Sequence, residues 1–131
     1  MKNITPKVLE KDIQREICEW LAQCNFFFWR QNTTPIFGMS GSGTKSFRSM
    51  PKYAIKGLPD IIVLHEGIFI GIEVKRPTHT NKRKDQEETG QKIIDNGGFY
   101  FIARSLEEAK YKTMKIITSE TDEDFFPTSQ P

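Results

Sequence analysis

Asp60, Glu73 and Lys75 are residue types that could act together on a phosphate ester. The two carboxylates lie on either side of a short apolar stretch, and the lysine follows the second carboxylate by two positions. One or two carboxylates, with waters and substrate phosphate oxygens, suffice to hold a hard cation such as Mg²⁺. Such a metal activates water, and a neighbouring cation offsets the charge that develops on the phosphate. The spacing therefore predicts a metal-dependent site for phosphodiester hydrolysis.

Two strands joined by a tight turn would position these side chains. The runs Ile61–Leu64 and Ile68–Lys75 are rich in β-branched and aromatic residues, and His65-Glu66-Gly67 separates them. Because successive strand side chains alternate between faces, Glu73 and Lys75 share one face. We expect the carboxylate that precedes the first run to lie beside this pair, at neighbouring strand ends. The opposite face of the second strand carries Ile68, Ile70, Ile72 and Val74.

The same residues belong to a wider set of motifs. Pro-Asp at 59–60 is followed by Glu-x-Lys at 73–75, by Gln86 and by Gly97-Gly98, in that order. This set resembles the VRR-NUC branch of the PD-(D/E)xK nuclease superfamily, specifically its small stand-alone phage and prophage members. The resemblance begins at Leu9–Gln14, which is similar to the opening helix of that family, and extends to Arg104–Ala109. It covers nearly all of the chain except the tail.

The resemblance implies additional members of the site. It implies a role for Gln86, a metal contact from the backbone carbonyl of Val74, and an acidic residue supplied by the first helix. Glu10 is the position that the opening motif suggests, and Glu16 is its competitor. At about 100° per residue their separation turns them roughly 120° apart, so both cannot face one metal.

The resemblance also implies an activity and a substrate. It predicts an endodeoxyribonuclease that depends on Mg²⁺ or Mn²⁺, acts on branched DNA such as Holliday junctions, and works as a homodimer. Two alternatives remain open. One is a non-catalytic nucleic-acid-binding module of the same fold, and the other is a nuclease that acts on flap or duplex DNA.

Each proposed site residue also has a simpler structural explanation. Pro59-Asp60 could be a turn before a strand, Glu73 and Lys75 an exposed ion pair, and Gln86 a residue of a helix surface. A glutamate in an otherwise apolar strand is costly without a partner or a metal. Taken together, the set therefore favours the functional interpretation. His65 and His79 have no companion at triad or zinc spacing, and we leave them out of the site.

Basic residues gather around the predicted site, although the net charge of the chain is only +2. Residues 45–84 contain nine basic residues against three acidic ones. Such a local excess is what contacts to phosphate groups require. The predicted DNA-binding residues are Lys45, Arg48, Lys52, Lys56, Arg76, Lys82, Arg83 and Lys84.

Apolar periodicity predicts the remaining elements. We expect a helix over about 9–24, a buried strand over 26–30, a helix over 83–96 and a strand over 99–103. Ser105 suits the N-cap of a last helix that ends near Ile117, and Ser-x-x-Glu at 105–108 suits a capping box. The order α-β-β-β-α-β-α predicts an α/β fold, a restriction-endonuclease-like mixed sheet flanked by helices.

The length of the chain favours one domain. We expect the nuclease domain over 1–118, with a basic loop at about 31–57 that suits a flap over nucleic acid, and an acidic flexible tail over 119–131. Cys18 and Cys24 lack the spacing of a zinc site and predict reduced thiols. No run is apolar and long enough to span a membrane, and no secretion signal is visible, so we expect a cytoplasmic protein without a membrane partner.

Four consecutive aromatic residues, from Phe26 to Trp29, offer apolar surface for a second copy of the chain. A strand buries only alternate side chains against its own core unless both faces of the sheet are covered. A two-fold dimer also suits a four-way junction, because its resolution needs two cuts on opposed strands.

Overall fold

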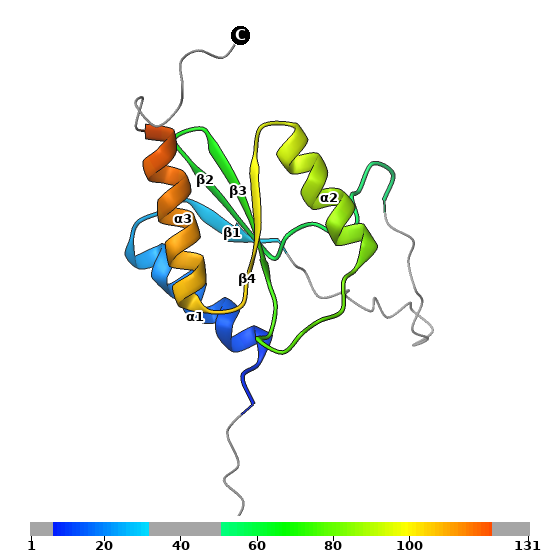
Figure 1. Cartoon of the computed structure of the whole chain (residues 1–131). Coiled ribbons are helices and arrows are strands. Elements are labelled where there is room, and N and C mark those ends of the chain that lie inside the picture. The colour runs from blue at the N-terminus through cyan, green and yellow to red at the C-terminus, as the bar shows by residue number, and fades with distance from the viewer. Residues whose placement is uncertain (1–6, 32–50, 122–131) are drawn as a thin grey trace, which may run out of the picture.

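A computed structural model describes residues 7–31 and 51–121 (Figure 1). Its order confirms the predicted α-β-β-β-α-β-α arrangement of an α/β fold. Lys45, Arg48, most of the basic loop and residues 122–131 of the tail lie outside the described residues. The elements are α1 (Glu10–Gln23), β1 (Phe28–Arg30), β2 (Ile61–His65), β3 (Ile68–Val74), α2 (Lys84–Asp95), β4 (Phe99–Ala103) and α3 (Leu106–Thr121).

The described strands form one mixed sheet in the order β1-β2-β3-β4. β1 and β2 are antiparallel, as are β2 and β3, whereas β3 and β4 are parallel. The β2–β3 hairpin turns at Glu66 and Gly67, whose φ angles of 49° and 84° are both positive. Two positive φ angles match the right-handed twist of the flanking strands, which confirms the predicted hairpin. α2 supplies the longer connection that parallel strands require.

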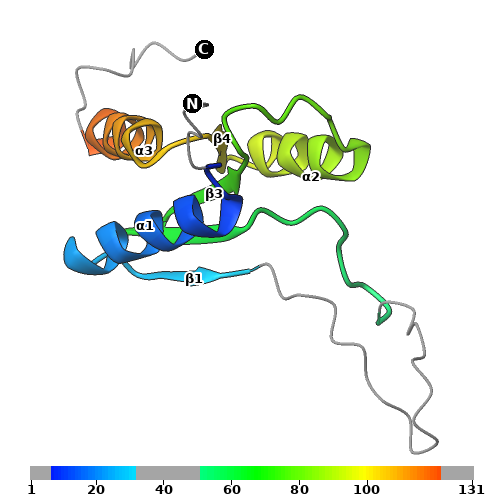
Figure 2. The same cartoon turned by 90° about the horizontal axis from the view of Figure 1, so that it is seen from below.

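Helices cover both faces of the sheet. Figure 2 shows α1 and α3 on one side of the strands and α2 on the other. The hydrophobic core lies on the α1/α3 side, where aliphatic residues of α1 meet alternate residues of β2 and β3. Its buried members include Ile13, Ile17, Leu21, Ile61, Val63, Ile70, Ile72, Val74, Ala103 and Ala109.

The predicted ends of the last two helices are confirmed in part. α2 stops before Gly97, whose φ of 90° suits a glycine, and the N–H groups of Gly97 and Gly98 donate to carbonyls of the last turn. Ser105 caps α3, because its Oγ accepts the Glu108 N–H at 3.1 Å. α3 continues to Thr121, beyond the predicted end near Ile117.

The prediction that the aromatic strand is buried was wrong. β1 is a three-residue strand at the edge of the described sheet, and both Trp29 and Arg30 are exposed. Phe26 and Phe28 pack against the core, whereas Phe27 is exposed. Alternation explains the difference, because an edge strand that α2 does not cover buries only the side chains on its core face.

Cys18 and Cys24 are free thiols, one half-buried and the other exposed. Among the residues that the structure describes, no helix has the length and the apolar composition that crossing a membrane would require.

Candidate active site

Asp60 and Glu73 face each other across the β2–β3 pair. Ile61 pairs with Ile72, and the antiparallel register carried one residue further places Asp60 opposite Glu73. The Val74 N–H donates to Asp60 Oδ2 at 2.7 Å, which fixes the Asp60 carboxylate against β3. Glu73 is 3% exposed, so its carboxylate is withdrawn from solvent. The structure thus brings together the two carboxylates that the sequence singled out.

The approach to Asp60 depends on two glycines. Gly57 has a φ of 76°, and a Cβ there would lie 2.3 Å from the carbonyl oxygen of Asp85 at the start of α2. A Cβ on Gly71 would lie 2.6 Å from the Pro59 ring. The segment before Asp60 therefore packs against α2 and against β3 at distances that only glycine permits. These close contacts fix where the Asp60 carboxylate lies.

Lys75 and Glu73 are joined by the amide of Gln86, from the first turn of α2. Lys75 Nζ donates to Gln86 Oε1 at 2.7 Å, and Gln86 Nε2 donates to Glu73 Oε2 at 2.9 Å. Lys75 Nζ also lies 3.7 Å from Glu73 Oε2. An ammonium needs an acceptor and a carboxylate needs a donor, so this amide orientation satisfies both partners. Gln86 is therefore a member of the cluster and not a residue of the helix surface.

Both carboxylates have raised pKa values. Burial raises the pKa of Glu73 to about 8, and the charge of Asp60 adds to the rise while Lys75 opposes it. Burial also raises the pKa of Asp60, although its hydrogen bond from the Val74 N–H favours the ionised form. The cations of the chain thus offset the charges of this pair only in part.

One oxygen of the pair requires a proton shared with the second carboxylate, or a bound cation. Glu73 Oε1 is buried and accepts no hydrogen bond from a donor in the described part of the chain. A buried carboxylate oxygen beside a second carboxylate is stabilised by a shared proton or by a cation. Within residues 7–31 and 51–121, no three His, Cys, Asp or Glu side chains form a complete metal cage. Mg²⁺ does not need one, because waters and substrate phosphates complete its octahedron, so the residues present fit such an ion.

Glu10 and Glu16 differ in their relation to this pair. The charge of Glu10 reaches Asp60 and Glu73, because it contributes to the raised pKa of both. Glu10 is the first residue of α1, and its Oε1 lies 3.8 Å from His79 Nδ1. Glu16 is exposed. Of the two, Glu10 is therefore the one whose charge acts on the pair, although it does not complete a three-residue metal-binding group with Asp60 and Glu73 in the described part of the chain.

Two contributors to this region are absent from the sequence prediction. Arg104 Nη1 donates to the carbonyl oxygens of Arg76 and His79 at 2.9 and 2.7 Å, which ties down the connector between β3 and α2. Tyr100 lies close enough that burial and then the charges of Glu73 and Asp60 raise its pKa to about 12. Arg104 and Tyr100 lie close to Gly97-Gly98 along the chain, but no local pattern indicates that they reach Asp60 and Glu73.

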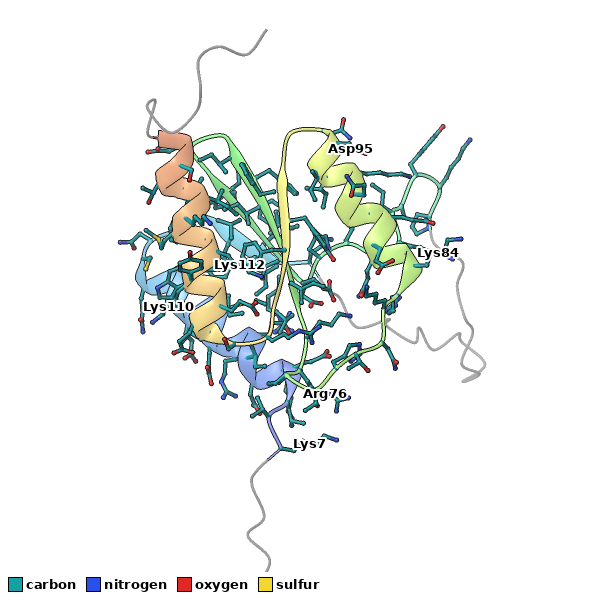
Figure 3. The ribbon with its side chains drawn as sticks, in the orientation of Figure 1. Lys7, Arg76, Lys84, Asp95, Lys110 and Lys112 are labelled. Carbon is teal, nitrogen blue, oxygen red and sulfur yellow. The ribbon has the colours of Figure 1, made fainter. Side chains whose placement is uncertain are left out.

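The predicted DNA-binding cations that the structure describes lie on the surface of the protein. Lys52, Lys56, Lys82, Arg83 and Lys84 are exposed and Arg76 is half-buried. Arg76 lies at the end of the molecule where α1 begins, and Lys84 lies on the side of α2 turned away from the sheet (Figure 3). Arg83 Nη2 is 2.8 Å from Asp85 Oδ2, so part of its charge is already paired.

No protein-family model matches the sequence, and no curated protein matches it. Solved structures do match the fold. One described as a "VRR_NUC domain" is 18% identical, with a TM-score of 0.51 over 83% of this chain and 94% of its own. Another, a "VRR_NUC domain protein", is 15% identical, with a TM-score of 0.54 over 86% of this chain and 91% of its own. This protein therefore has the fold of the VRR_NUC domains, as its motifs predict.

Proposed function

We propose that this protein is a metal-dependent nuclease that hydrolyses phosphodiester bonds in DNA. The fold of VRR_NUC domains supports a nuclease, since that is the family its motifs resemble. The observation that carries the proposal is the buried Glu73 Oε1, which has no donor in the described chain and belongs to a carboxylate opposite Asp60. A sheet held only for stability gains nothing from a buried carboxylate placed against a half-buried one.

Asp60 and Glu73 would hold the metal, with the Val74 carbonyl as a further oxygen donor and with Glu10 at the edge of the site, where its charge acts on the pair. When bound, Mg²⁺ or Mn²⁺ supplies activation of water and neutralisation of phosphate charge. Burial of Glu73, beside the half-buried Asp60, keeps competing water away from its oxygens and strengthens its attraction for a cation. The Val74 N–H holds Asp60 in place for this task.

Lys75 would act on the phosphate or on the attacking water. Its Nζ has three N–H donors, of which one is directed at Gln86 Oε1. The ammonium can therefore direct another donor to a phosphate oxygen where negative charge develops. Gln86 forms a hydrogen bond with Lys75 and another with Glu73 through one amide, and so fixes the two side chains relative to each other. This is the role of a positioning residue.

Branched DNA is the substrate class that we propose, with a homodimer as the acting form. The described chain holds one such pair of carboxylates, whereas resolution of a four-way junction needs two cuts. A two-fold dimer presents two sites to two opposed strands. The exposed cations of the connector and the 51–57 segment would bind the phosphates of the arms. The predicted contacts from Lys45 and Arg48 belong to this proposal.

The test is a cleavage assay with the purified protein and labelled four-way, flap, duplex and single-stranded DNAs. We expect cuts in Mg²⁺ or Mn²⁺, none in EDTA, and none with Asp60→Asn. Binding of DNA by Asp60→Asn in EDTA should match or exceed that of the wild type, because repulsion of phosphate falls. Binding without any cut on any substrate would favour the non-catalytic module, and cuts restricted to flap or duplex DNA would exclude the junction.

The oligomeric state is a separate measurement. Analytical ultracentrifugation at micromolar concentration should give the mass of two chains. A protein that stays monomeric and still cuts both strands of a junction symmetrically would contradict the dimer.

A further inference from the structure

Phe27 and Trp29 present two aromatic side chains to solvent at the edge of the described sheet. Phe27 is 65% exposed and Trp29 is 37% exposed, although large aromatic side chains are mostly buried. Their ring centroids lie 5.7 Å apart. The intervening Phe28 packs against the core, so this pair is directed away from it. The stability of the fold does not explain why they are aromatic.

The register places this pair on the face that carries the carboxylates. Trp29 pairs with Ile62, which pairs with Gly71 of β3. Cross-strand partners share a face, and Glu73, two residues beyond Gly71, lies on that face as well. Asp60 is the diagonal neighbour of Trp29, a relation that spans roughly 7 to 8 Å and lies within reach of aromatic side chains.

Gln31 links Trp29 to Asp60. The Trp29 Nε1–H donates to Gln31 Oε1 at 2.8 Å, and the Gln31 N–H donates to the Asp60 carbonyl at 2.8 Å. The single polar group of the indole is therefore satisfied within the chain. What remains for a ligand is the flat ring face, which suits stacking and does not call for a hydrogen-bonding partner.

We propose that Trp29, with Phe27, stacks on an unpaired nucleobase of the strand whose phosphate lies at Asp60 and Glu73. This inference rests on the proposed nuclease function and narrows its substrate to branched DNA in which a base near the cut is unpaired or has lost a stacking neighbour at the branch point. Every base has a π-face that stacks on an aromatic ring, whereas the faces of bases inside a duplex are already stacked on their neighbours. A second copy of the chain on the same surface is the competing occupant. The position of Trp29 on the carboxylate face, diagonal to Asp60, favours the base.

The first experiment follows Trp29 directly. The chain has two tryptophans, so Trp20→Phe leaves Trp29 as the sole indole. We expect oligo(dT), added in EDTA, to quench the fluorescence of this variant, and a blunt duplex of the same length to quench it far less. Equal quenching by both DNAs, or none by either, would overturn the proposal.

The second experiment measures affinity in EDTA by fluorescence anisotropy. Trp29→Ala should weaken binding of oligo(dT) by about 5- to 150-fold, and Trp29→Phe should restore most of the loss. Duplex affinity should change by less than about twofold. Leu64→Ala is the matched control, because Leu64 is exposed and on the same face but aliphatic. Its affinity for oligo(dT) should equal that of the wild type. A loss with Leu64→Ala equal to that with Trp29→Ala would indicate a general apolar surface and overturn the proposal.

These experiments distinguish refutation of the stacking proposal from refutation of the proposed nuclease function. If a well-folded Trp29→Ala variant binds oligo(dT) with wild-type affinity and the wild type cleaves DNA, the stacking proposal is refuted. The nuclease proposal then stands. If Trp29→Ala loses affinity for oligo(dT) and the wild type does not cleave DNA, the stacking proposal is supported. The nuclease proposal is then refuted. A change from dimer to monomer on Trp29→Ala in sedimentation of the DNA-free protein assigns the surface to the second copy and overturns the proposal.

Discussion

The two faces of β3 differ sharply, although they belong to one strand. Toward α1 and α3 the strand presents Ile70, Ile72 and Val74, all buried among aliphatic side chains. Toward α2 it presents Gly71 and Glu73, followed by Lys75 beyond the end of the strand. The first face is close-packed hydrocarbon. The second holds a buried ion pair, a raised pKa and a carboxylate oxygen without a donor in the described chain.

This difference indicates that alternate residues of β3 have different roles, one set in stability and the other in binding or reaction. The aliphatic face removes apolar surface from water and stabilises the fold. The polar face costs stability, since its charges are desolvated, and it is retained where it binds or reacts. Substitutions on the two faces should therefore have opposite signatures, one in stability and one in activity.

The largest effect is expected at the carboxylates. Glu73→Gln should lower cleavage by about a thousandfold or more, because a proposed metal ligand is lost. The metal-free variant should be at least as stable as the wild type, because glutamine cannot take up the negative charge whose burial raises the pKa of Glu73. Mn²⁺ should raise the melting temperature of the wild type and not that of the variant. A strong loss of stability with cleavage intact would show that Glu73 stabilises the fold and does not take part in cleavage.

Lys75→Met should lower kcat/KM by about a hundred- to a thousandfold, as when one donor to a developing charge is removed. Methionine keeps most of the buried volume, so the fold should persist. The rise in melting temperature on adding Mn²⁺ should be retained, since Lys75 is not a ligand. An unchanged rate would make the lysine a neutralising partner of Glu73 and nothing more.

Glu10 and Glu16 test how far the polar face extends onto α1. Glu10→Gln should lower kcat/KM by about 10- to 100-fold, because its charge reaches both carboxylates. Glu16→Gln, on the exposed side of the same helix, is the matched control and should retain the wild-type rate. Steady-state rates of the two variants decide the matter, and the reverse pattern would assign the helix carboxylate to Glu16.

Ile72→Val is the complementary change on the aliphatic face. Removal of one methylene from this fully buried side chain should lower the free energy of unfolding by about 0.5 to 1.5 kcal/mol. Cleavage per folded molecule should stay within about twofold, which chemical denaturation and a rate measurement can establish together. A tenfold loss of rate at full folding would break the proposed separation of the two faces.

The smallest effect concerns a carboxylate outside the polar face. Burial raises the pKa of Glu108, but the Arg104 N–H bond and Lys112 outweigh it and hold the pKa below its ordinary value of 4.5. A lowered pKa contributes stability above pH 4.5, and this is lost as the pH falls through the folded-state value. Glu108→Gln should lose about 1 kcal/mol or less at pH 7 and show a shallower decline in acid. The exposed Glu107→Gln should follow the wild type, and indistinguishable acid profiles would refute the role.

The sequence by itself determined the order of the elements and the alternation of β3. Apolar runs, the Glu66-Gly67 turn of the hairpin and the Gly97-Gly98 stop are local signals, and local signals fix local structure. The same alternation placed Glu73 and Lys75 on one face before any packing was known. Ser105 was identified in the same way, because a cap depends on residues within one turn.

Tertiary structure alone decided what surrounds these residues. Which helix covers which face brought Gln86 to Glu73 and Lys75, and it left Phe27 and Trp29 uncovered. The predicted burial of β1 was wrong because burial depends on neighbouring elements, whereas strand propensity is a property of the segment.

Arg104 and Tyr100 reach the site for a related reason. They follow from the parallel pairing of β4 with β3, a contact between segments far apart in the chain. The alternation of residues in the sequence determines which side chains share a face of a strand. Only the packing of helices against the sheet determines which residues each face contacts.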